Sequence, residues 1–468
     1  MIDSFRRTSS YPGPDPHEEL PTVTTVQSPP APPTAIRPRA VARTGLYAVL
    51  AANAAAVTYF FADAGFGASN TLVVLGRLAG LYGALLMAFQ LLLVARLPWL
   101  DRRIGMDRLT SWHRWTGFGI LWTLLAHAVF IVFGYADSSG LDPVNQLVDL
   151  AETVEGVLRA VAALVIVMVV GAVSGRAARR RLAYETWHFI HLYTYLAVVL
   201  AFTHQVAVGT TFTASSAATA YWYTLWAVAL GAVFTGRLVL PLWRNQRHRL
   251  TVSAVVPESH DVVSVYITGR DLDRLPARAG QFFLWRFLTK DRWWQANPFS
   301  LSAAPDGRTL RLTAKAAGAG SAGLRHLKPG TRVFAEGPYG AFTALHRTRP
   351  ESVLIAGGVG VTPIRALLEE LRGHAVVVYR VAAERDAVLY DELRELALAK
   401  GAELHLVTGP VHPDKLAPAE LARLVPDIAE RDVFLCGPPP MMRAVLGSLR
   451  ELNVPKQQIH FERFALTG

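Results

Sequence analysis

Cysteine is nearly absent from this chain of 468 residues, which contains Cys436 alone. One thiol excludes an internal disulfide framework and any CxxC metal site, so any redox chemistry must rely on bound cofactors. An apolar run is missing from residues 1–43, which are rich in Pro, Thr and Ser. A secretory signal peptide requires such a run, so we expect a disordered Pro-rich tail here.

Acidic residues are outnumbered by basic ones, and the formal net charge is +11. The arginines gather in loops between apolar segments, where membrane topology explains them better than a nucleic acid partner does. No nucleic acid partner is therefore expected. The hydrophobic content of 51% indicates a membrane protein, and it is concentrated before about residue 243.

Six apolar stretches have the length of a membrane-spanning helix, at 45–62, 73–95, 113–134, 157–175, 187–208 and 221–242. Arginine is abundant before the first stretch and after the second, fourth and sixth. The other three loops contain no Lys or Arg, and the loop at 135–156 is acidic. Because basic residues accumulate on the cytoplasmic face, we predict a multi-pass protein of the plasma (inner) membrane with both termini in the cytoplasm.

Histidines occur at matched depths on two of these stretches, with His113 and His127 on the third and His191 and His204 on the fifth. At ~1.5 Å rise and ~100° per residue, the first two lie ~21 Å apart along the helix and ~40° from the same face. Histidine inside a membrane is costly and implies buried partners. Two facing helices that each donate one histidine at two depths can hold two haem irons, so we predict an inner pair, His113 with His191, and an outer pair, His127 with His204.

The fifth stretch leaves two questions open. His191 and His204 are ~140° out of register on a straight helix, so the helix bends, carries a π-bulge, or holds the two haems at different azimuths. His188 is an alternative inner ligand, although it is ~160° out of register with His204. Each histidine could instead hydrogen-bond a neighbouring helix, but four at matched depths on two spans make that interpretation the weaker one.

Short strands and turns replace the apolar stretches after residue 249. The first strands are expected at 250–256, 262–268, 281–286, 310–314 and 332–336. Strands of this length between Gly, Pro and Asp turns predict an antiparallel β-barrel domain at 245–346, which follows a six-helix transmembrane bundle at 44–244.

Strand, glycine loop and helix then alternate. Strands are expected at 352–356, 375–380, 403–407 and 432–436, and helices at 363–372, 388–400 and 439–452. This rhythm predicts a parallel, doubly wound α/β domain at 347–468. Its first strand runs into the turn Gly357-Gly358-Val359-Gly360-Val361-Thr362-Pro363. Glycines there let a diphosphate approach the backbone, although tight turns of this kind also occur for structural reasons alone.

Four further motifs stand in order along the same half: Pro298-Phe299-Ser300-Leu301-Ser302, Gly318 to Ser321, Gly337-Pro338-Tyr339-Gly340, and Cys436-Gly437-Pro438-Pro439. With the glycine turn, they resemble the ferredoxin-NADP reductase superfamily. Joined to a six-span domain with paired histidines, the chain from about residue 45 onward resembles the bacterial ferric reductase and NADPH oxidase family.

The resemblance implies an FAD site in the barrel domain, at Pro298, Phe299, Ser300, Gly318, Ser321 and Gly337. In this assignment Pro298 and Phe299 line the flavin, and the Ser300 hydroxyl lies near the reactive N5. Gly318 and Ser321 meet the FAD diphosphate.

The resemblance also implies an NAD(P)H site in the α/β domain. Its nucleotide phosphates would meet Gly357, Gly358, Gly360, Thr362 and Pro363, and its nicotinamide edge would meet Cys436, Gly437 and Pro438. Glu462 and Phe464 match a C-terminal segment whose aromatic ring covers the isoalloxazine, although Phe464 could also be a core residue.

Two parts of the chain bear on cofactor binding: one on how tightly FAD is held, and the other on whether NADPH or NADH is used. Asn297 stands where relatives have Arg or His, so a charged contact to FAD is missing. Arg380 ends the second parallel strand, with Arg385 close behind, and arginine there suits the 2′-phosphate of NADPH. Ala382 occupies a place where Ser or Arg often helps, so NADPH is favoured while NADH stays possible.

The resemblance implies a transmembrane oxidoreductase that takes hydride from cytoplasmic NAD(P)H onto FAD. Electrons would then pass singly through two b-type haems to an acceptor on the outer face. Ferric chelates and dioxygen are the two candidate acceptors, and the acidic 135–156 loop favours a cation near the exit. The alternative is an electron-transfer module that reduces an extracytoplasmic partner protein.

Overall fold

The computed structural model describes residues 39–468 apart from 66–69, 176–177, 179–180, 183, 410–415 and 463–468. Most of the predicted tail, three of the arginines after the fourth span and Phe464 therefore lie outside the described residues. The described elements belong to one unit of the chain, residues 36–468.

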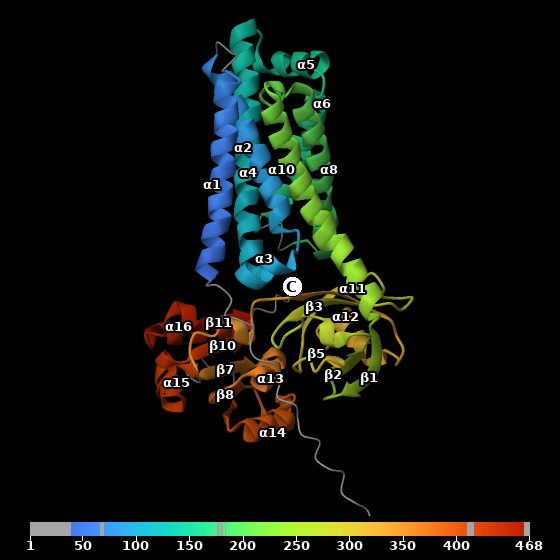
Figure 1. Ribbon diagram of the computed structural model, residues 1–468, viewed down its shortest axis with the longest axis vertical. Coiled ribbons are helices and arrows are strands. Elements are labelled where there is room, and N and C mark those ends of the chain that lie inside the picture. Colours follow the sequence, from blue (N-terminus) through green and yellow to red (C-terminus); the bar gives the residue numbers. More distant parts are fainter. Residues whose placement is uncertain are drawn as a thin grey trace, which may run out of the picture. The chain divides into compact units, whose positions relative to one another are not determined.

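Among the described residues, six helices are long and apolar enough to cross a membrane, as the hydropathy pattern predicts. They stand side by side in Figure 1 and are α1 (Arg39–Asp63), α2 (Thr71–Leu93), α4 (Met106–Ser139), α6 (Val157–Ser174), α8 (Tyr184–Val208) and α10 (Ser216–Phe234). A π-helical turn, η1 (Thr235–Val239), continues α10 into α11 (Leu240–His248). Short helices α3 (Pro98–Ile104) and α9 (Thr210–Thr213) lie between the long ones.

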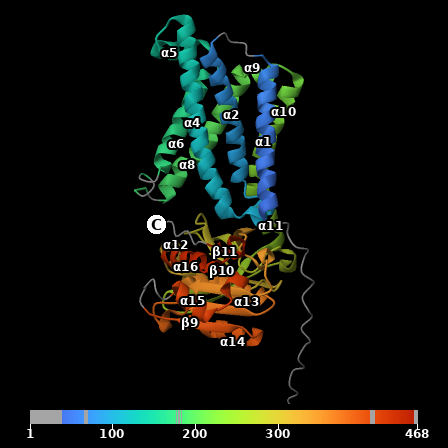
Figure 2. The same cartoon turned by 90° about the vertical axis from the view of Figure 1, so that its left-hand side faces the viewer.

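The prediction of a loop at 135–156 is wrong, because α4 extends to Ser139 and a further helix, α5 (Pro143–Thr153), follows. The side chain of Asp142 caps α5 by accepting a hydrogen bond from the backbone N–H of Val144 at 3.0 Å. An Asp N-cap followed by Pro at the first helical position is a local helix-start signal. Figures 1 and 2 show α5 at the end of the bundle away from α11.

Helix α2 packs closely on α4 because glycines line the contact. A Cβ built on Gly76 would lie 3.0 Å from Ile131, and one on Gly83 would lie 2.7 Å from Leu124. Small residues at this spacing let two membrane helices approach without a gap. This close contact fixes the depth at which α4 presents its histidines.

The segment after α11 forms two antiparallel three-stranded sheets, ordered β1-β2-β5 and β4-β3-β6. The strands are β1 (Thr251–Pro257), β2 (Val262–Thr268), β3 (Phe282–Phe287), β4 (Asn297–Ser300), β5 (Thr309–Lys315) and β6 (Val333–Tyr339). Isolated bridges, Thr251 with Arg332 and Leu301 with Leu312, join the two sheets. The antiparallel strands are thus confirmed; β4 is additional, and Pro298 inside it obscured the strand signal.

A five-stranded parallel sheet follows, ordered β11-β10-β7-β8-β9. Its strands are β7 (Ser352–Gly357), β8 (Ala375–Arg380), β9 (Glu403–Val407), β10 (Asp432–Cys436) and β11 (Ile459–Glu462). Helices α13 (Val361–Glu370) and α14 (Tyr390–Lys400) cover one face, and α15 (Pro418–Leu424) and α16 (Pro439–Glu451) cover the other. The predicted α/β architecture is confirmed, with β11 and α15 as additions. The strand order reverses between β7 and β10, and ligands bind at such a point in parallel sheets.

Candidate functional site

The outer histidine pair meets between α4 and α8. The ring centres of His127 and His204 lie 6.5 Å apart, at an interplanar angle of 62°. The Nδ1 atom of His127 is 2.8 Å from the carbonyl oxygen of Gly76, and that of His204 is 3.1 Å from the carbonyl oxygen of Gly156. A carbonyl can only accept, so each Nδ1 carries the proton and each Nε2 keeps a lone pair for a ligand role.

Glycines make this arrangement possible, and the sequence analysis did not identify them. A Cβ on Gly80 would fall 2.7 Å from Nδ1 of His127, so a larger residue would displace the ring. Gly156 has φ +85°, a backbone conformation that L side chains rarely adopt. The spacing of Gly76, Gly80 and Gly83 on an apolar helix is the sequence signal that indicates such close packing.

The inner pair consists of His113 and His191, with ring centres 5.9 Å apart at 63°. The Nδ1 atoms of both rings are buried and have no hydrogen-bond partner within the described part of the chain. The ring of Trp187 packs 5.0 Å from that of His191. His188 is exposed, and its ring lies 6.4 Å from the same tryptophan. The geometry therefore brings His191, rather than His188, beside His113.

Both pairs have the separation that a shared metal ion requires. Two metal–imidazole bonds of ~2 Å, with roughly 1 Å from each nitrogen to its ring centre, place the ring centres about 6 Å apart. The observed 5.9 and 6.5 Å match this value. Helix α8 is α-helical from Tyr184 to Val208, so a π-bulge is not the reason that both of its histidines find partners.

The candidate flavin residues lie on and beside β4. Ser300 is buried at the end of the strand, and its Oγ is a buried atom without a hydrogen-bond partner among the described residues. Phe299 is half-buried, Pro298 is exposed, and Trp285 Nε1 donates to the carbonyl oxygen of Phe299 at 3.0 Å. A buried hydroxyl without a partner indicates that another molecule completes its hydrogen bonding.

The turn from Gly318 to Ser321 lies against the start of the same strand. Ser321 Oγ accepts hydrogen bonds from the backbone N–H groups of Ala317 at 2.9 Å and Gly318 at 3.2 Å. A Cβ built on Gly320 would lie 3.0 Å from Oδ1 of Asn297. The turn from Gly318 to Ser321 and the strand that begins at Asn297, about twenty residues apart in the sequence, are thus brought together.

The segment that contains Gly337 is attached to the ends of the membrane helices. Arg244 of α11 donates to the carbonyl oxygen of Gly337. The backbone N–H of Gly340 donates to Oδ2 of Asp101 in α3 at 2.7 Å. Arg96, which follows α2, forms an ion pair of 2.7 Å with Glu336. These contacts tie β6 to three parts of the helical half.

The two glycine turns of the α/β half meet at the carboxyl edge of the sheet. A Cβ on Gly360 would lie 2.3 Å from the carbonyl oxygen of Cys436, and one on Gly437 would lie 3.1 Å from Cα of Gly357. Gly358 has φ +51° and open space on its Cβ side. This edge is the point where the strand order reverses, so the predicted nucleotide residues gather where the topology places a ligand.

The neighbours of these turns complete the same edge. Thr362 and Pro363 are buried in the first turn of α13, and Pro438 precedes α16. Cys436 pairs in register with Glu462 of β11. Burial, together with the Glu462 charge, raises the pKa of the Cys436 thiol well above its usual value. The thiol is therefore neutral and is a poor nucleophile.

Arg380 lies at this edge but has backbone partners. Its guanidinium donates to the carbonyl oxygens of Val381, of Val407 at 3.3 Å and of Gly409 at 2.7 Å. These bonds fix the chain that leaves β8 and β9. To contact a 2′-phosphate as predicted, Arg380 must either keep these backbone hydrogen bonds and bind the phosphate as well, or break some of them.

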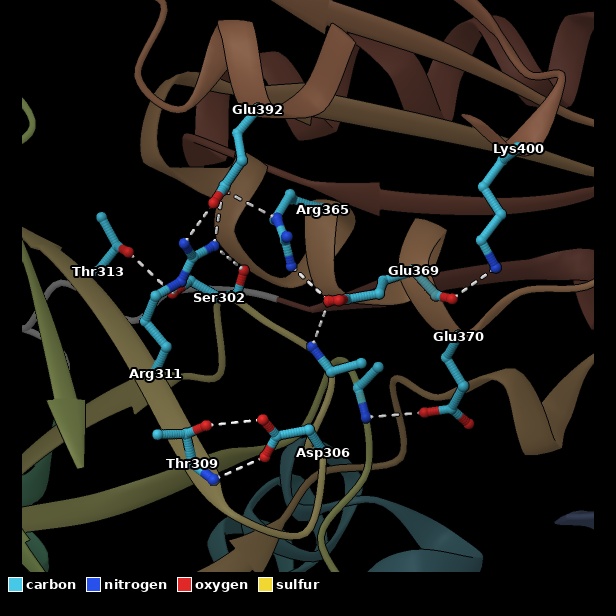
Figure 3. A network of polar contacts seen from close by, with 12 residues as sticks. Ser302, Asp306, Thr309, Arg311, Thr313, Arg365, Glu369, Glu370, Glu392 and Lys400 are labelled. Carbon is cyan, nitrogen blue, oxygen red and sulfur yellow. Dashed lines mark hydrogen bonds and ion pairs between the residues drawn. The ribbon is translucent and has the colours of Figure 1, made fainter. Parts of the chain in front are cut away.

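An ion-pair network links the antiparallel and parallel halves (Figure 3). Arg311 of β5 binds Glu392 of α14 with two hydrogen bonds, of 2.6 and 2.8 Å, and also donates to Ser302. Arg365 of α13 contacts Glu392 at 3.0 Å and pairs with Glu369. Burial opposes ionisation of Glu392, but the two arginines hold its pKa below its usual value. No local sequence pattern indicated this network, because its partners are far apart along the chain.

Comparisons with known proteins match the helical half and the soluble half of the chain separately. Residues 79–202 match the family described as a ferric reductase like transmembrane component, and residues 354–446 match an oxidoreductase NAD-binding domain. The chain is 34% identical over 189 residues to ferredoxin–NADP reductase B of Sorangium cellulosum, a match that covers 36% of this chain and 77% of that protein.

Two further matches cover less than half of the chain. The ferredoxin reductase component of a 3-ketosteroid-9-alpha-monooxygenase from Mycobacterium tuberculosis is 31% identical over 232 residues, or 46% of this chain and 64% of the relative. The chain therefore spans less than two thirds of that relative's length. The flavohem-like FAD/NAD binding domain of a nitric oxide dioxygenase from Vibrio cholerae is 27% identical, with a TM-score of 0.40, and the match covers 47% of this chain and 99% of that structure.

Proposed function

We propose that this chain, which joins a ferric reductase-like transmembrane domain to a ferredoxin–NADP reductase-type module, passes electrons from NAD(P)H across a membrane to an acceptor on the other side. The two histidine pairs carry this proposal. Rings from α4 and α8 meet at two levels, with ring centres 5.9 and 6.5 Å apart, which suits two b-type haems each held by two histidines.

The chain's own groups hold these rings in the ligand orientation. At the outer level, the carbonyl groups of Gly76 and Gly156 fix the Nδ1 protons of His127 and His204. This orients each ring and raises the basicity of Nε2. At the inner level, His113 and His191 keep their Nδ1 atoms buried between helices. Two histidine ligands to each haem would leave its iron without a free site, which would suit electron passage better than oxygen binding.

The soluble half supplies the electrons in this proposal. FAD, when bound, converts the two-electron donor NAD(P)H into a one-electron supply. Ser300 offers the flavin edge a hydroxyl that has no other partner among the described residues, and Gly358, whose Cβ side is open, lets the nucleotide diphosphate approach the backbone. Cys436 borders the nicotinamide as a neutral thiol, so it shapes the pocket without attacking the ring.

The direction of transfer follows from the charges of the loops. The arginine-rich loops support an orientation with both termini and the nucleotide site in the cytoplasm, in which electrons would leave at the outer face. NADPH is the favoured donor, on the strength of Arg380 and Arg385. Helix α5, in the 135–156 segment without Lys or Arg, exposes Asp149 and Glu152. These carboxylates favour a cation near the exit, and a ferric chelate and dioxygen are the two candidate acceptors. A partner protein that accepts the electrons is the alternative.

Stopped-flow spectroscopy of the purified protein tests the proposal. The protein is reduced anaerobically with NADPH and then mixed with ferric citrate or with dioxygen at equal concentration. We expect haem absorbance that NADPH reduces and that one of the two acceptors reoxidises, and the faster of the two identifies the acceptor. A protein without haem would refute the proposal. Reduced haem that neither acceptor reoxidises would favour the partner-protein alternative.

A further inference from the structure

Arg292 lies in the loop between β3 and β4, five residues before Asn297. Its side chain is 18% exposed, and its Nη1 atom is buried without a hydrogen-bond acceptor within the described residues. Within the described part of the chain, its ion-pair partner is the neighbouring Asp291, at 3.4 Å through Nε, and that carboxylate is 70% exposed. A buried guanidinium N–H without an acceptor is costly, so this position suits an anionic ligand.

The guanidinium lies over the end of the turn that begins at Gly318. A Cβ built on Gly323 would fall 2.0 Å from both Nη atoms of Arg292, so the arginine is in close contact with that backbone. Three residues earlier, a Cβ on Gly320 would meet Asn297 at 3.0 Å and Gln295 at 3.5 Å. The loop 292–297 therefore crosses the turn 318–323, with Arg292 at one end of the crossing and Asn297 at the other.

This placement bears on the flavin site proposed above. Asn297 cannot supply the positive charge that Arg or His would supply at that position. Arg292 reaches the same turn from another point of the loop, and guanidinium binds phosphate oxygens through two parallel hydrogen bonds. We infer that Arg292 is the cationic ligand of the FAD diphosphate in this chain and replaces the charge absent at position 297.

The inference rests on the proposed flavin site and makes a specific claim about affinity. One hydrogen bond from a charged group contributes enough that its loss weakens binding about 10- to 100-fold. Riboflavin has the same ring system and no phosphate. Removal of Arg292 should therefore weaken FAD binding and leave riboflavin binding unchanged.

The experiment uses the full-length protein in detergent with its flavin removed. Dissociation constants for FAD and riboflavin are measured by quenching of flavin fluorescence, for wild type, Arg292→Ala and Arg292→Gln. Lys290→Ala is the matched control, because it removes an exposed charge from the same loop. We expect about a 10- to 100-fold loss of FAD affinity in both Arg292 variants, no change for riboflavin, and little change in the control.

A second substitution tests the replacement directly. Asn297→Arg, added to Arg292→Ala, puts a guanidinium over the same turn and should restore most of the lost FAD affinity. An equal loss for FAD and riboflavin, or a folded Arg292→Gln protein that binds FAD like wild type, would overturn the inference. A wild-type protein that binds neither flavin would instead reject the proposed flavin site, which is a distinguishable outcome.

Discussion

Arg311 and Glu392 form the best-defined connection between the antiparallel and parallel halves, and we predict that it stabilises the soluble module (Figure 3). The Arg311 side chain is 5% exposed, and that of Glu392 is 37% exposed. Removing one partner of a buried ion pair costs about 3–5 kcal/mol. Because Glu392 is partly solvated and Arg365 keeps Glu369 as a partner, we expect Glu392→Ala to cost about 2 kcal/mol.

A loss of this size is measurable by thermal denaturation. For a module of roughly 200 residues, about 2 kcal/mol lowers the Tm by about 4–8 °C. A double-mutant cycle with Arg311→Met isolates the pair, and we expect a coupling energy of about 2 kcal/mol. The exposed pair Arg423 and Glu420 is the matched control, and Glu420→Ala should cost less than about 1 kcal/mol. Additive effects of Arg311→Met and Glu392→Ala would refute the reasoning.

The same pair predicts a pH dependence. The arginines hold the pKa of Glu392 below its usual value, so the unfolded chain binds the proton more tightly than the folded chain does. The stabilisation is therefore complete above the unfolded pKa of about 4.3 and is lost as the pH falls through the lower folded value. The Tm difference between wild type and Glu392→Gln should be full at neutral pH and should shrink below about pH 4. A difference that stays constant into acid would show that shape, not charge, matters.

The remaining predictions concern the cofactor residues. A pyridine haemochrome assay should give two b-type haems per chain, with one remaining in His191→Ala and both in His188→Ala; a single haem in wild type would rule out two centres. Arg380→Ala should raise the KM for NADPH and leave that for NADH nearly unchanged, whereas equal effects would assign Arg380 to the backbone contacts alone. If the Phe464 ring covers the flavin, Phe464→Ala should bind NADP⁺ more tightly, seen as a stronger charge-transfer band. A lower melting temperature with unchanged nucleotide affinity would instead make Phe464 a packing residue, since truncating a buried Phe costs about 3–5 kcal/mol.

Local patterns were sufficient for most of the architecture. Hydropathy located all six long helices, and the strands β2, β8, β9 and β10 have their predicted bounds. The misses have local causes. Pro298 hid β4, and the acidic composition of 135–156 concealed an amphipathic helix that Asp142 caps.

The histidine pairs show the limit of periodicity. Counting residues on the fifth span left His188 and His191 as alternatives, and it left a bend, a π-bulge or two haems at different azimuths as ways to pair His204. The structure brings His191 beside His113 and His204 beside His127 with α8 assigned as α-helix throughout. Which histidine of α8 faces which histidine of α4 depends on how the two helices cross and rotate. Packing decides this, and the residue spacing within one helix does not.

The sequence by itself determined the element types, the two kinds of sheet and the set of cofactor motifs, because these depend on hydropathy period and on turn chemistry within short windows. Tertiary structure alone decided which backbone carbonyls hold the outer histidines, that Arg292 meets the turn at Gly323, and that Arg311 meets Glu392 across two sheets. Such contacts join residues tens of positions apart, and their geometry depends on the packed positions of whole elements. No pattern within a short window predicts such contacts. The sequence therefore showed that Asn297 lacks a positive charge, but it did not show that Arg292 lies against the same turn.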